Sequence, residues 1–406
     1  SQKAAWESFH ALHKAGKIRA AWAVENGIGE AVMKMAFGNE IGFSASADLL
    51  GEWHMPAQYG FIVAELSEEV DAPYAVRIGD TTAEKEIVLG NDRATIAELL
   101  ALNDAVLENV YPTNAPAKGK DIPAFAYDKG TNAAPAVKCA RPKVLIPVFP
   151  GTNCEYDSAR AVESAGAEAD IVVIRNLTAD DVARSVETVT KKLAESQMVF
   201  IPGGFSGGDE PDGSAKFITA FFRNPSVKEQ VGELLDKRDG LMLGICNGFQ
   251  ALIKLGLVPY GKIIDTDADC PTLTYNIIGR HQSKLVRTRV CTNKSPWLAG
   301  TNVGDIYTVP ISHGEGRFLC SEELVRKLAE NGQIATQYVD LAGNPSMDTA
   351  FNPNGSVCAI EGITSPDGRV LGKMGHSERI GKNLYRNVIG EYDMQLFESA
   401  VKYFKG

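Results

Sequence analysis

One cysteine of this 406-residue sequence lies between two glycines, where an apolar strand pattern gives way to a helical one. The segment reads Leu-Gly-Ile-Cys246-Asn-Gly-Phe-Gln, with Gly244 and Gly248 flanking the cysteine. This G-x-C-x-G spacing is the thiol counterpart of a G-x-S-x-G nucleophile elbow, whose small residues allow a sharp turn that projects the nucleophile. The following helix N-terminus favours a thiolate. The pattern predicts a nucleophile, although without a partner base a buried structural cysteine fits about as well.

A histidine and a glutamate follow another apolar strand pattern, in Leu371-Gly-Lys-Met-Gly-His376-Ser-Glu378-Arg. A nucleophilic thiol needs a base that takes and returns its proton, and the base must itself be oriented. In an extended segment residues i and i+2 point to the same side, so Glu378 can hold the His376 ring in one tautomer. The sequence therefore predicts a triad of Cys246, His376 and Glu378. Surface or structural roles are expected for four other histidines: His10, His13, His54 and His281.

A glycine-rich loop, Ile201-Pro-Gly-Gly-Phe-Ser-Gly-Gly-Asp209, follows a further strand pattern. The backbone N–H groups of Gly203 and Gly204 can face an oxyanion there, with the N–H of Asn247 as a second donor. Such a loop can also cradle a phosphate, but it lacks the G-K-[ST] ending of a P-loop.

A second glycine-rich loop, Ile311-Ser-His-Gly-Glu-Gly-Arg317, also follows a strand pattern. It contains His313, which is a rival base. The alternative is a loop that only shapes a substrate pocket.

Short apolar strands alternate with amphipathic helices around these motifs. We expect strands at 144–149, 170–174, 198–201 and 241–245, a helix at 179–193, and later strands at 285–290, 306–311, 334–339, 357–360 and 370–374. This alternation predicts the α/β class, with a doubly wound, mostly parallel sheet covered by helices.

A proline-rich stretch precedes this region. Five prolines lie between Tyr111 and Pro142, with little apolar periodicity, which is typical of a linker. Before it, helix patterns at 2–12 and 28–37 and strand-like runs at 60–66 and 74–78 predict a small α+β unit. We therefore expect an α+β domain at 1–111, a linker at 112–141 and an α/β domain at 142–406.

Length and composition agree with two domains, because single cores rarely grow beyond about 250–300 residues. The net charge of −10 gives no basic surface, so no nucleic-acid partner is expected. No apolar run approaches the roughly 18 residues that span a bilayer, and no signal sequence opens the chain, so we expect a cytoplasmic protein without a membrane partner. The seven cysteines lack a C-x-x-C pair, so we expect no metal site and mostly reduced structural thiols, Cys154 among them.

Four motifs together resemble the class I (triad) glutamine amidotransferases: Gly-Ile-Cys-Asn-Gly-Phe-Gln250, Pro-Gly-Gly-Phe-Ser206, Ser-His-Gly-Glu-Gly-Arg317 and His-Ser-Glu378. Within that class the sequence is most similar to the glutaminase domain of the phosphoribosylformylglycinamidine synthases, whose opening signature resembles Phe149-Pro-Gly-Thr-Asn-Cys-Glu-Tyr-Asp157. The resemblance covers roughly residues 141–406 and implies a flavodoxin-like class I glutaminase fold.

The resemblance also implies residue roles. Cys246 would attack the side-chain amide of glutamine, forming a γ-glutamyl thioester and releasing ammonia, with His376 as base and then acid and Glu378 as its orienter. Gln250 resembles a position that contacts bound glutamine. The segment Ser312-His313-Gly314-Glu315 resembles one whose backbone holds the α-amino and α-carboxylate groups of glutamine.

One position departs from the family. Ser377 stands where the family usually has a proline, whose fixed φ favours the extended conformation, so serine permits the triad geometry without enforcing it.

The first part of the chain resembles the same synthases more weakly. Residues 16–38 are similar to the C-terminal half of an aminoimidazole-ribonucleotide-synthetase-like module, which in the family precedes the glutaminase in one polypeptide. The resemblance implies that this chain is a fragment without the synthetase site. ATP and Mg²⁺ would then act in the full synthetase and not in this chain, and the remaining synthetase domains would be its partners.

Three other functions stay open. The chain can be a glutaminase serving another acceptor, or another cysteine hydrolase on the same kind of sheet. It can also be a non-catalytic docking module when isolated. Glutamate release measured with and without synthetase domains distinguishes these possibilities.

Overall fold

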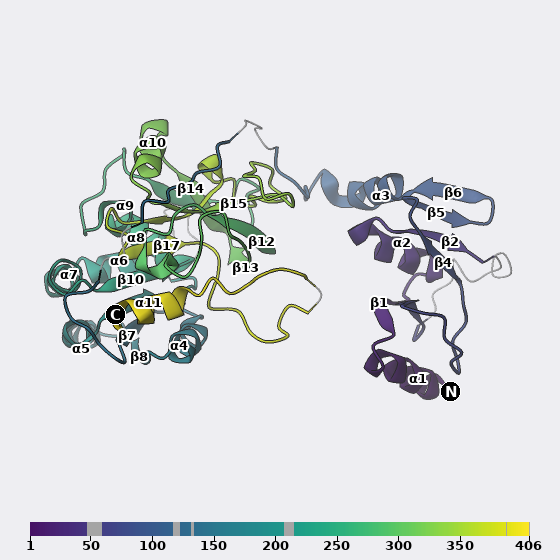
Figure 1. Cartoon of the computed structure of the whole chain (residues 1–406), viewed down its shortest axis with the longest axis horizontal. Coiled ribbons are helices and arrows are strands. Elements are labelled where there is room, and N and C mark those ends of the chain that lie inside the picture. Colours follow the sequence, from purple (N-terminus) through teal and green to yellow (C-terminus); the bar gives the residue numbers. More distant parts are fainter. Residues whose placement is uncertain (47–58, 117–121, 131–133, 207–214, 387, 406) are drawn as a thin grey trace. The chain divides into compact units, whose positions relative to one another are not determined.

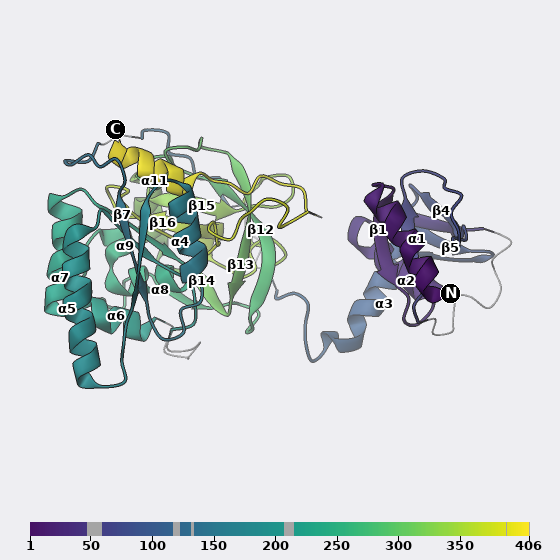
Figure 2. The same ribbon diagram turned by 90° about the horizontal axis from the view of Figure 1, so that it is seen from below.

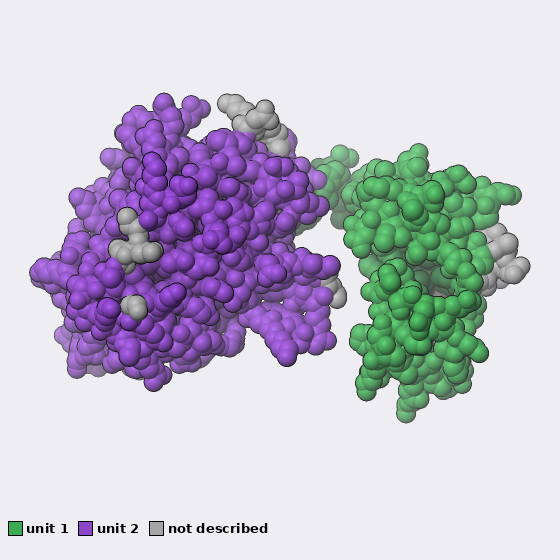
Figure 3. Space-filling model, in the orientation of Figure 1, with its two compact units in different colours: residues 1–113 green, residues 114–406 purple. Residues whose placement is uncertain are grey.

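The chain divides into two compact units, residues 1–113 and 114–406 (Figures 1 and 3). The computed structural model describes residues 1–46, 59–116, 122–130, 134–206, 215–386 and 388–405. His54 and positions 207–209 of the first glycine-rich loop lie outside these ranges. None of the helices in the described ranges has the length and apolar character needed to cross a bilayer.

The first unit contains three helices and two small sheets among its described residues. The sheets have the strand orders β1-β3 and β4-β2-β5-β6. Its elements are α1 (Gln2–Lys14), β1 (Ile18–Ala23), α2 (Ile28–Asn39), β2 (Gly42–Ala45), β3 (Ile62–Leu66), β4 (Gly79–Thr82), β5 (Glu86–Leu89), β6 (Asp92–Thr95) and α3 (Ile96–Glu108). Val32 of α2 belongs to the same buried core as Phe43 and Ile87 of the larger sheet. A capping box between Thr95 and Glu98 begins α3.

One strand expected in this unit is absent. Residues 74–78 form no strand, and β4 begins only at Gly79. Tyr74 has a φ of 66°, a left-handed conformation that a bulky residue rarely adopts and that a strand cannot contain. The apolar run was therefore a misleading signal.

The second unit is built on a nine-stranded sheet of order β13-β12-β15-β16-β17-β10-β9-β7-β8, which confirms the predicted α/β class. The strands from β8 to β17 in this order are parallel, and β16, β15, β12 and β13 extend the sheet antiparallel. The strands are β7 (Lys143–Val148), β8 (Glu168–Val173), β9 (Met198–Ile201), β10 (Leu241–Ile245), β12 (Gln282–Val290), β13 (Ile306–His313), β15 (Ile334–Tyr338), β16 (Ile360–Thr364) and β17 (Val370–Lys373).

Helices connect and cover these strands. They are α4 (Glu155–Ser164), α5 (Ala179–Glu195), α6 (Lys216–Phe222), α7 (Pro225–Gly232), α8 (Asn247–Leu255), α9 (Leu257–Tyr260), α10 (Glu322–Glu330) and α11 (Leu396–Lys405), with short turns of other helix types at Glu233–Lys237, Pro296–Leu298 and Val357–Ala359. The connections β7-α4-β8 and β8-α5-β9 run in opposite directions across the sheet, so right-handed crossovers place α4 and α5 on opposite faces. Figure 2 shows α5 beside α7, which it contacts.

Burial explains why the central strands read as continuous apolar runs. Every residue of β9 and of β10 is buried, as expected for parallel strands covered on both faces. In register, Gly244 of β10 lies between Ile201 of β9 and Gly372 of β17. The carboxyl ends of these three strands therefore meet at one edge of the sheet, where ligands of open α/β sheets usually bind.

Two other segments differ from expectation. The strand predicted at 357–360 begins only at Ile360, because Cys358 and Ala359 have left-handed φ values of 49° and 55°. The second glycine-rich loop is mostly strand: β13 runs to His313, and β14 (Glu315–Leu319) starts after Gly314 and pairs with β11 (Thr272–Tyr275). Because β11 lies well before β14 in the sequence, no local pattern predicted that these two strands pair.

Part of the predicted linker is held on the second unit. The N–H of Tyr127 donates to Cys291 O (2.8 Å), the N–H of Phe125 donates to Gln337 Oε1 (2.9 Å), and the N–H of Cys139 donates to Phe404 O (2.9 Å). Since these residues are hydrogen-bonded to the second unit, the described part of the linker between 122 and 139 is not a free tether.

Candidate active site

Cys246 lies on a sharp turn between β10 and α8. Its backbone has a φ of 53° and a ψ of −106°, a conformation that costs a non-glycine residue about 1–3 kcal/mol and is found mainly at functional sites. A Cβ on Gly248 would lie 1.9 Å from Ile201 O, and one on Gly244 would lie 2.6 Å from the Gly248 backbone. The two glycines are therefore required by close backbone approach, as the elbow pattern predicted.

His376 and Glu378 form a buried pair, but in a turn after β17 and not in the extended segment that was predicted, because the N–H of Arg379 donates to His376 O (3.2 Å). His376 Nδ1 lies 2.6 Å from Glu378 Oε1, and the exposed fractions of the two side chains are 2% and 0%. If Nδ1 donates to the carboxylate, Nε2 keeps its lone pair and can act as a base. This Nε2 is buried and has no hydrogen-bond partner in the described part of the chain.

Gly203 separates the proposed base from the nucleophile. A Cβ at this position would lie 2.6 Å from His376 Cε1, 3.5 Å from Cys246 Cβ and 3.1 Å from Cys154 Sγ. The three side chains therefore surround one glycine, and any larger residue would push them apart. The structure thus brings together all three residues of the predicted triad around the first glycine-rich loop.

The first glycine-rich loop packs against the segment 149–157, which carries the opening signature of the family resemblance. The N–H of Phe205 donates to Gly151 O (2.8 Å), and the N–H of Asn153 donates to Gly203 O (3.3 Å). These bonds leave the N–H groups of Gly203 and Gly204 without a backbone acceptor among the described residues. Their role as oxyanion donors stays a prediction that this geometry permits.

The Cys246 thiol is neutral at rest. Burial is the main cause that raises its pKa, to about 12, with Cys154 and Glu378 adding to the rise, while the N–H of Asn247 opposes it. The start of α8 favours the thiolate as expected, through the Asn247 N–H, but burial outweighs this effect on the pKa of Cys246. The Cys246 thiol therefore has to pass its proton to a base when the sulfur attacks.

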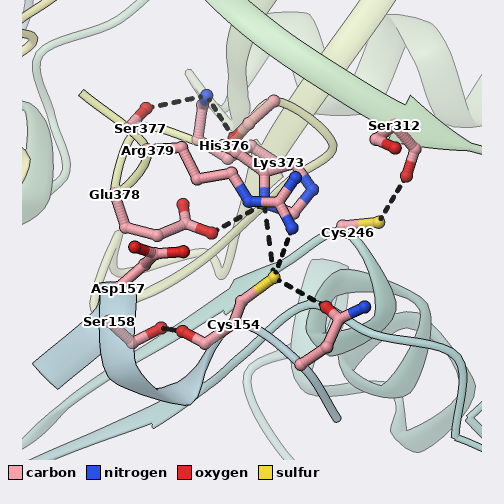
Figure 4. Close-up of polar contacts among 12 residues, drawn as sticks. Cys154, Asp157, Ser158, Cys246, Ser312, Lys373, His376, Ser377, Glu378 and Arg379 are labelled. Atoms are coloured by element: carbon pink, nitrogen blue, oxygen red, sulfur yellow. Dashed lines mark hydrogen bonds and ion pairs between the residues drawn. The ribbon is translucent and has the colours of Figure 1, made fainter. Parts of the chain in front are cut away.

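Cys154 and Arg379 lie beside the pair. Arg379 Nη2 donates to Cys154 Sγ (2.9 Å), and this sulfur lies 3.9 Å from His376 Nδ1 (Figure 4). Burial, followed by the charge of Glu378, raises the pKa of Cys154 to about 12, so it is a neutral thiol. The sequence analysis missed Arg379, although its position directly after Glu378 was a signal.

The same cluster is the one place in the described residues where three ligand types could hold a metal ion. Ligand atoms of Cys154, His376 and Glu378 lie within 4.8 Å of one another. The guanidinium of Arg379 adds a positive charge at the sulfur, which disfavours a cation. The hydrogen-bonded acid–base arrangement explains the cluster better.

The backbone of the Ser312 to Glu315 segment faces the nucleophile. Cys246 Sγ lies 3.8 Å from Ser312 O (Figure 4). A buried chain of side chains anchors the far end of the segment: Ser206 Oγ donates to Asn247 Oδ1 (2.7 Å), Asn247 Nδ2 donates to Gln250 Oε1 (2.8 Å), and Gln250 Nε2 donates to Glu315 O (2.5 Å). Gln250 thus fixes this backbone, and its direct contact with glutamine stays a prediction.

His313 is a poor rival to His376. Its Nδ1 lies 3.1 Å from Asn276 Oδ1, and no carboxylate of the described residues is hydrogen-bonded to the ring. Burial above all, and then His376 and His281, lower the pKa of His313 to about 3, so the ring stays neutral. Asn276 Oδ1 accepts from the His313 ring and Asn276 Nδ2 donates to His313 O (2.8 Å), but Asn276 lies far from this motif in the sequence, so sequence reasoning did not find it.

A cleft of 360 Å³ opens beside this segment. Its lining includes Ser312, Lys284, Arg379 and Tyr385. Ser312 borders this cleft, and its carbonyl oxygen is the atom that lies 3.8 Å from Cys246 Sγ.

Three comparisons relate this geometry to known proteins. A family model described as a CobB/CobQ-like glutamine amidotransferase domain matches residues 141–404. Phosphoribosylformylglycinamidine synthase subunit PurQ of Methanococcus maripaludis is 35% identical over an alignment of 286 residues that covers 65% of this chain and 97% of that protein. The subunit of the same name in Aquifex aeolicus is 34% identical over 253 residues, 62% of this chain and 95% of that protein. A solved structure of PurLQS from Thermotoga maritima aligns with 65% of this chain and 100% of its own at 25% identity and a TM-score of 0.47.

Proposed function

Since the chain belongs to the family of CobB/CobQ-like glutamine amidotransferase domains, we propose that it hydrolyses glutamine to supply ammonia to phosphoribosylformylglycinamidine synthase in purine biosynthesis. The similarity to relatives named phosphoribosylformylglycinamidine synthase subunit PurQ supports the proposal that the ammonia is used by this synthase. The observation that carries the chemistry is Cys246 on a strained turn, beside a buried His376–Glu378 pair.

The first step forms a thioester. His376 Nε2 takes the proton of the neutral Cys246 thiol as the sulfur attacks the amide carbon of glutamine. The carbonyl oxygen becomes an oxyanion, which the N–H groups of Asn247 and the Gly203–Gly204 loop stabilise. When the tetrahedral intermediate collapses, the C–N bond breaks and His376 returns its proton to the leaving nitrogen, which departs as ammonia.

The second step releases glutamate. His376 takes a proton from water as the water oxygen attacks the thioester carbon. When the C–S bond breaks, His376 gives this proton to the sulfur, which restores the Cys246 thiol and frees glutamate. Glu378 keeps the ring in the same tautomer throughout and stabilises the imidazolium that forms twice.

The acceptor chemistry belongs to the synthetase partner. We propose that the other synthetase domains bind ATP, Mg²⁺ and formylglycinamide ribonucleotide, on the same polypeptide or as separate subunits. The first unit, residues 1–113, would be the C-terminal half of an aminoimidazole-ribonucleotide-synthetase-like module. This assignment rests on the motif resemblance of residues 16–38.

Complementation of the complete synthase tests the proposal. Cys246→Ser should abolish glutamine-dependent formation of formylglycinamidine ribonucleotide, while free ammonia still supports it at the wild-type rate. Loss of both activities would mean that Cys246 supports assembly, as in a docking module. Glutamine hydrolysis without any transfer to this acceptor would indicate a glutaminase that serves another one.

A further inference from the structure

A buried ammonium group lies beside the turn that carries His376 and Glu378. Lys373 is the last residue of β17, and 1% of its side chain is exposed. Its Nζ lies 3.4 Å from Oε1 of Glu361, whose side chain is 0% exposed. A buried ion pair is unfavourable unless its remaining donors and acceptors are satisfied. The partners of this pair are therefore informative.

The pair is satisfied by the backbone of the catalytic turn. Lys373 Nζ donates to Gly375 O (3.0 Å), and Glu361 Oε1 accepts the N–H of Gly375 (2.6 Å). The second oxygen of Glu361 accepts the hydroxyl of Thr336. Both backbone groups of Gly375 are thus held by opposite charges.

The turn has no freedom on its other sides. A Cβ on Gly375 would lie 2.5 Å from Val309 Cγ1 and 3.1 Å from Lys373 Nζ. The N–H of His376 donates to Pro310 O of β13 (2.8 Å). The backbone immediately before the His376 ring is therefore clamped between the ion pair and β13.

Lys373 also reaches past His376 to the next residue. Its Nζ donates to Ser377 Oγ at 3.1 Å (Figure 4). Ser377 is the position at which this sequence departs from the proline usual in the family. A proline restrains φ covalently, whereas the serine is restrained here through its hydroxyl.

We propose that Lys373 and Ser377 are positioning residues that together hold His376 and Glu378 in register with Cys246. The ammonium, anchored by Glu361, replaces the conformational restraint that a proline would give. This inference rests on the proposed function of the triad, because it concerns the same site.

A double-mutant cycle in the complete synthase tests the coupling. Lys373→Met alone would leave Glu361 buried without a counter-charge and can unfold the domain, so Lys373→Met is combined with Glu361→Gln. We expect Ser377→Ala and the Lys373→Met/Glu361→Gln variant each to lower kcat for glutamine hydrolysis by roughly 3- to 30-fold, with KM within about two-fold of wild type. The contact that Ser377→Ala removes is already absent from the Lys373→Met/Glu361→Gln variant, so the triple variant should be no slower than that variant.

Ser377→Pro separates positioning from general stability. No hydrogen bond from the Ser377 N–H occurs among the described residues, so proline removes none. When Ser377→Pro is added to the Lys373→Met/Glu361→Gln variant, kcat should rise at least about three-fold above that of the same variant with Ser377. The proline ring restrains φ without the ammonium. Unfolding temperatures of all variants show whether a lost kcat only reflects lost folding.

Cys246→Ser, assayed alongside, distinguishes failure of this inference from failure of the proposed function. If Cys246→Ser still hydrolyses glutamine, both are overturned. If it is inactive while folded Ser377→Ala retains the wild-type kcat, or if the effects in the cycle multiply independently, only the positioning inference is overturned.

Discussion

At the scale of single residues, Cys246 combines reactivity with burial. Its pKa of about 12 means that the thiol is protonated at neutral pH, so the site must generate the nucleophile during the reaction. The neighbouring base therefore carries more of the rate than it would beside a preformed thiolate.

Removal of that base should slow the first chemical step. His376→Ala should lower the rate of thioester formation by about 10²–10⁴-fold, the usual contribution of a positioned acid–base group. Rapid quenching with labelled glutamine measures this rate. His10→Ala, in α1 of the first unit, is the matched control and should react at the wild-type rate. An unchanged rate in His376→Ala would assign the base to another residue.

His313 should make stability depend on acid. Its pKa is about 3 in the folded chain and near 6.5 when unfolded, so the unfolded state binds a proton first as pH falls. Above pH 6.5 the imidazole is neutral in both states and His313 does not lower the free energy of unfolding. As the pH falls from 6.5 toward 3, the free energy of unfolding decreases by up to about 1.4 kcal/mol per pH unit. His313→Asn can keep the donor to Asn276 without titrating. Urea unfolding between pH 7 and 4 should show a shallower loss for His313→Asn, and parallel curves would contradict the assignment.

At the scale of elements, the sequence was most informative where strands are buried on both faces. The bounds predicted for β9 and β10 match the structure, because continuous apolar runs between glycine-rich turns leave little ambiguity. The strands with misleading signals were those near left-handed residues, such as Tyr74 and Cys358. Such backbone conformations depend on tertiary packing and have no apolar pattern of their own.

Only part of the candidate site could be predicted from local sequence patterns. Cys246, His376 and Glu378 each follow a central strand, so their motifs were local. Asn276 and Glu361 act through contacts with other segments of the chain, and no spacing in the sequence connects them to the motifs. Lys373 lies close to Ser377 in the sequence, but its burial and its pairing with Glu361 depend on the fold. Burial of the nucleophile, which reversed the expected shift of its pKa, is likewise a property of the packed domain.

Alanine substitution of two glycines tests whether the turn at Cys246 depends on the close backbone approach of Gly248. Gly248→Ala should destabilise the second unit by about 1–3 kcal/mol or more, because its Cβ would meet Ile201 O at 1.9 Å. Gly232→Ala, at the end of α7, has nothing within 4 Å and should be neutral or stabilising by up to about 1 kcal/mol. Chemical denaturation compares the two. Equal stabilities would mean that β9 and α8 lie further apart than described.

At the scale of the whole molecule, the two units should be separable by proteolysis. Trypsin can cut the predicted linker after Lys118, Lys120, Lys129 or Lys138. Phe125 and Tyr127, shortly before Lys129, and Cys139, next to Lys138, are hydrogen-bonded to the second unit, and cleavage needs a locally unfolded backbone. We expect cleavage first after Lys118 or Lys120, as read from fragment masses. Early cleavage after Lys129 or Lys138 would show that the 122–139 segment is not held.

The central claim is that one thiol of seven performs the chemistry, and site-mapped alkylation tests it most directly. A diazo-ketone analogue of glutamine should modify Cys246 first, in parallel with loss of glutaminase activity of the complete synthase, and glutamine should protect against both. The strained turn and the adjacent His376 make this sulfur the one that a glutamine-shaped electrophile can reach and activate. Mass spectrometry of the digested protein locates the thioether. Activity lost with the label on Cys154 or another cysteine, while Cys246 stays unmodified, would contradict the account.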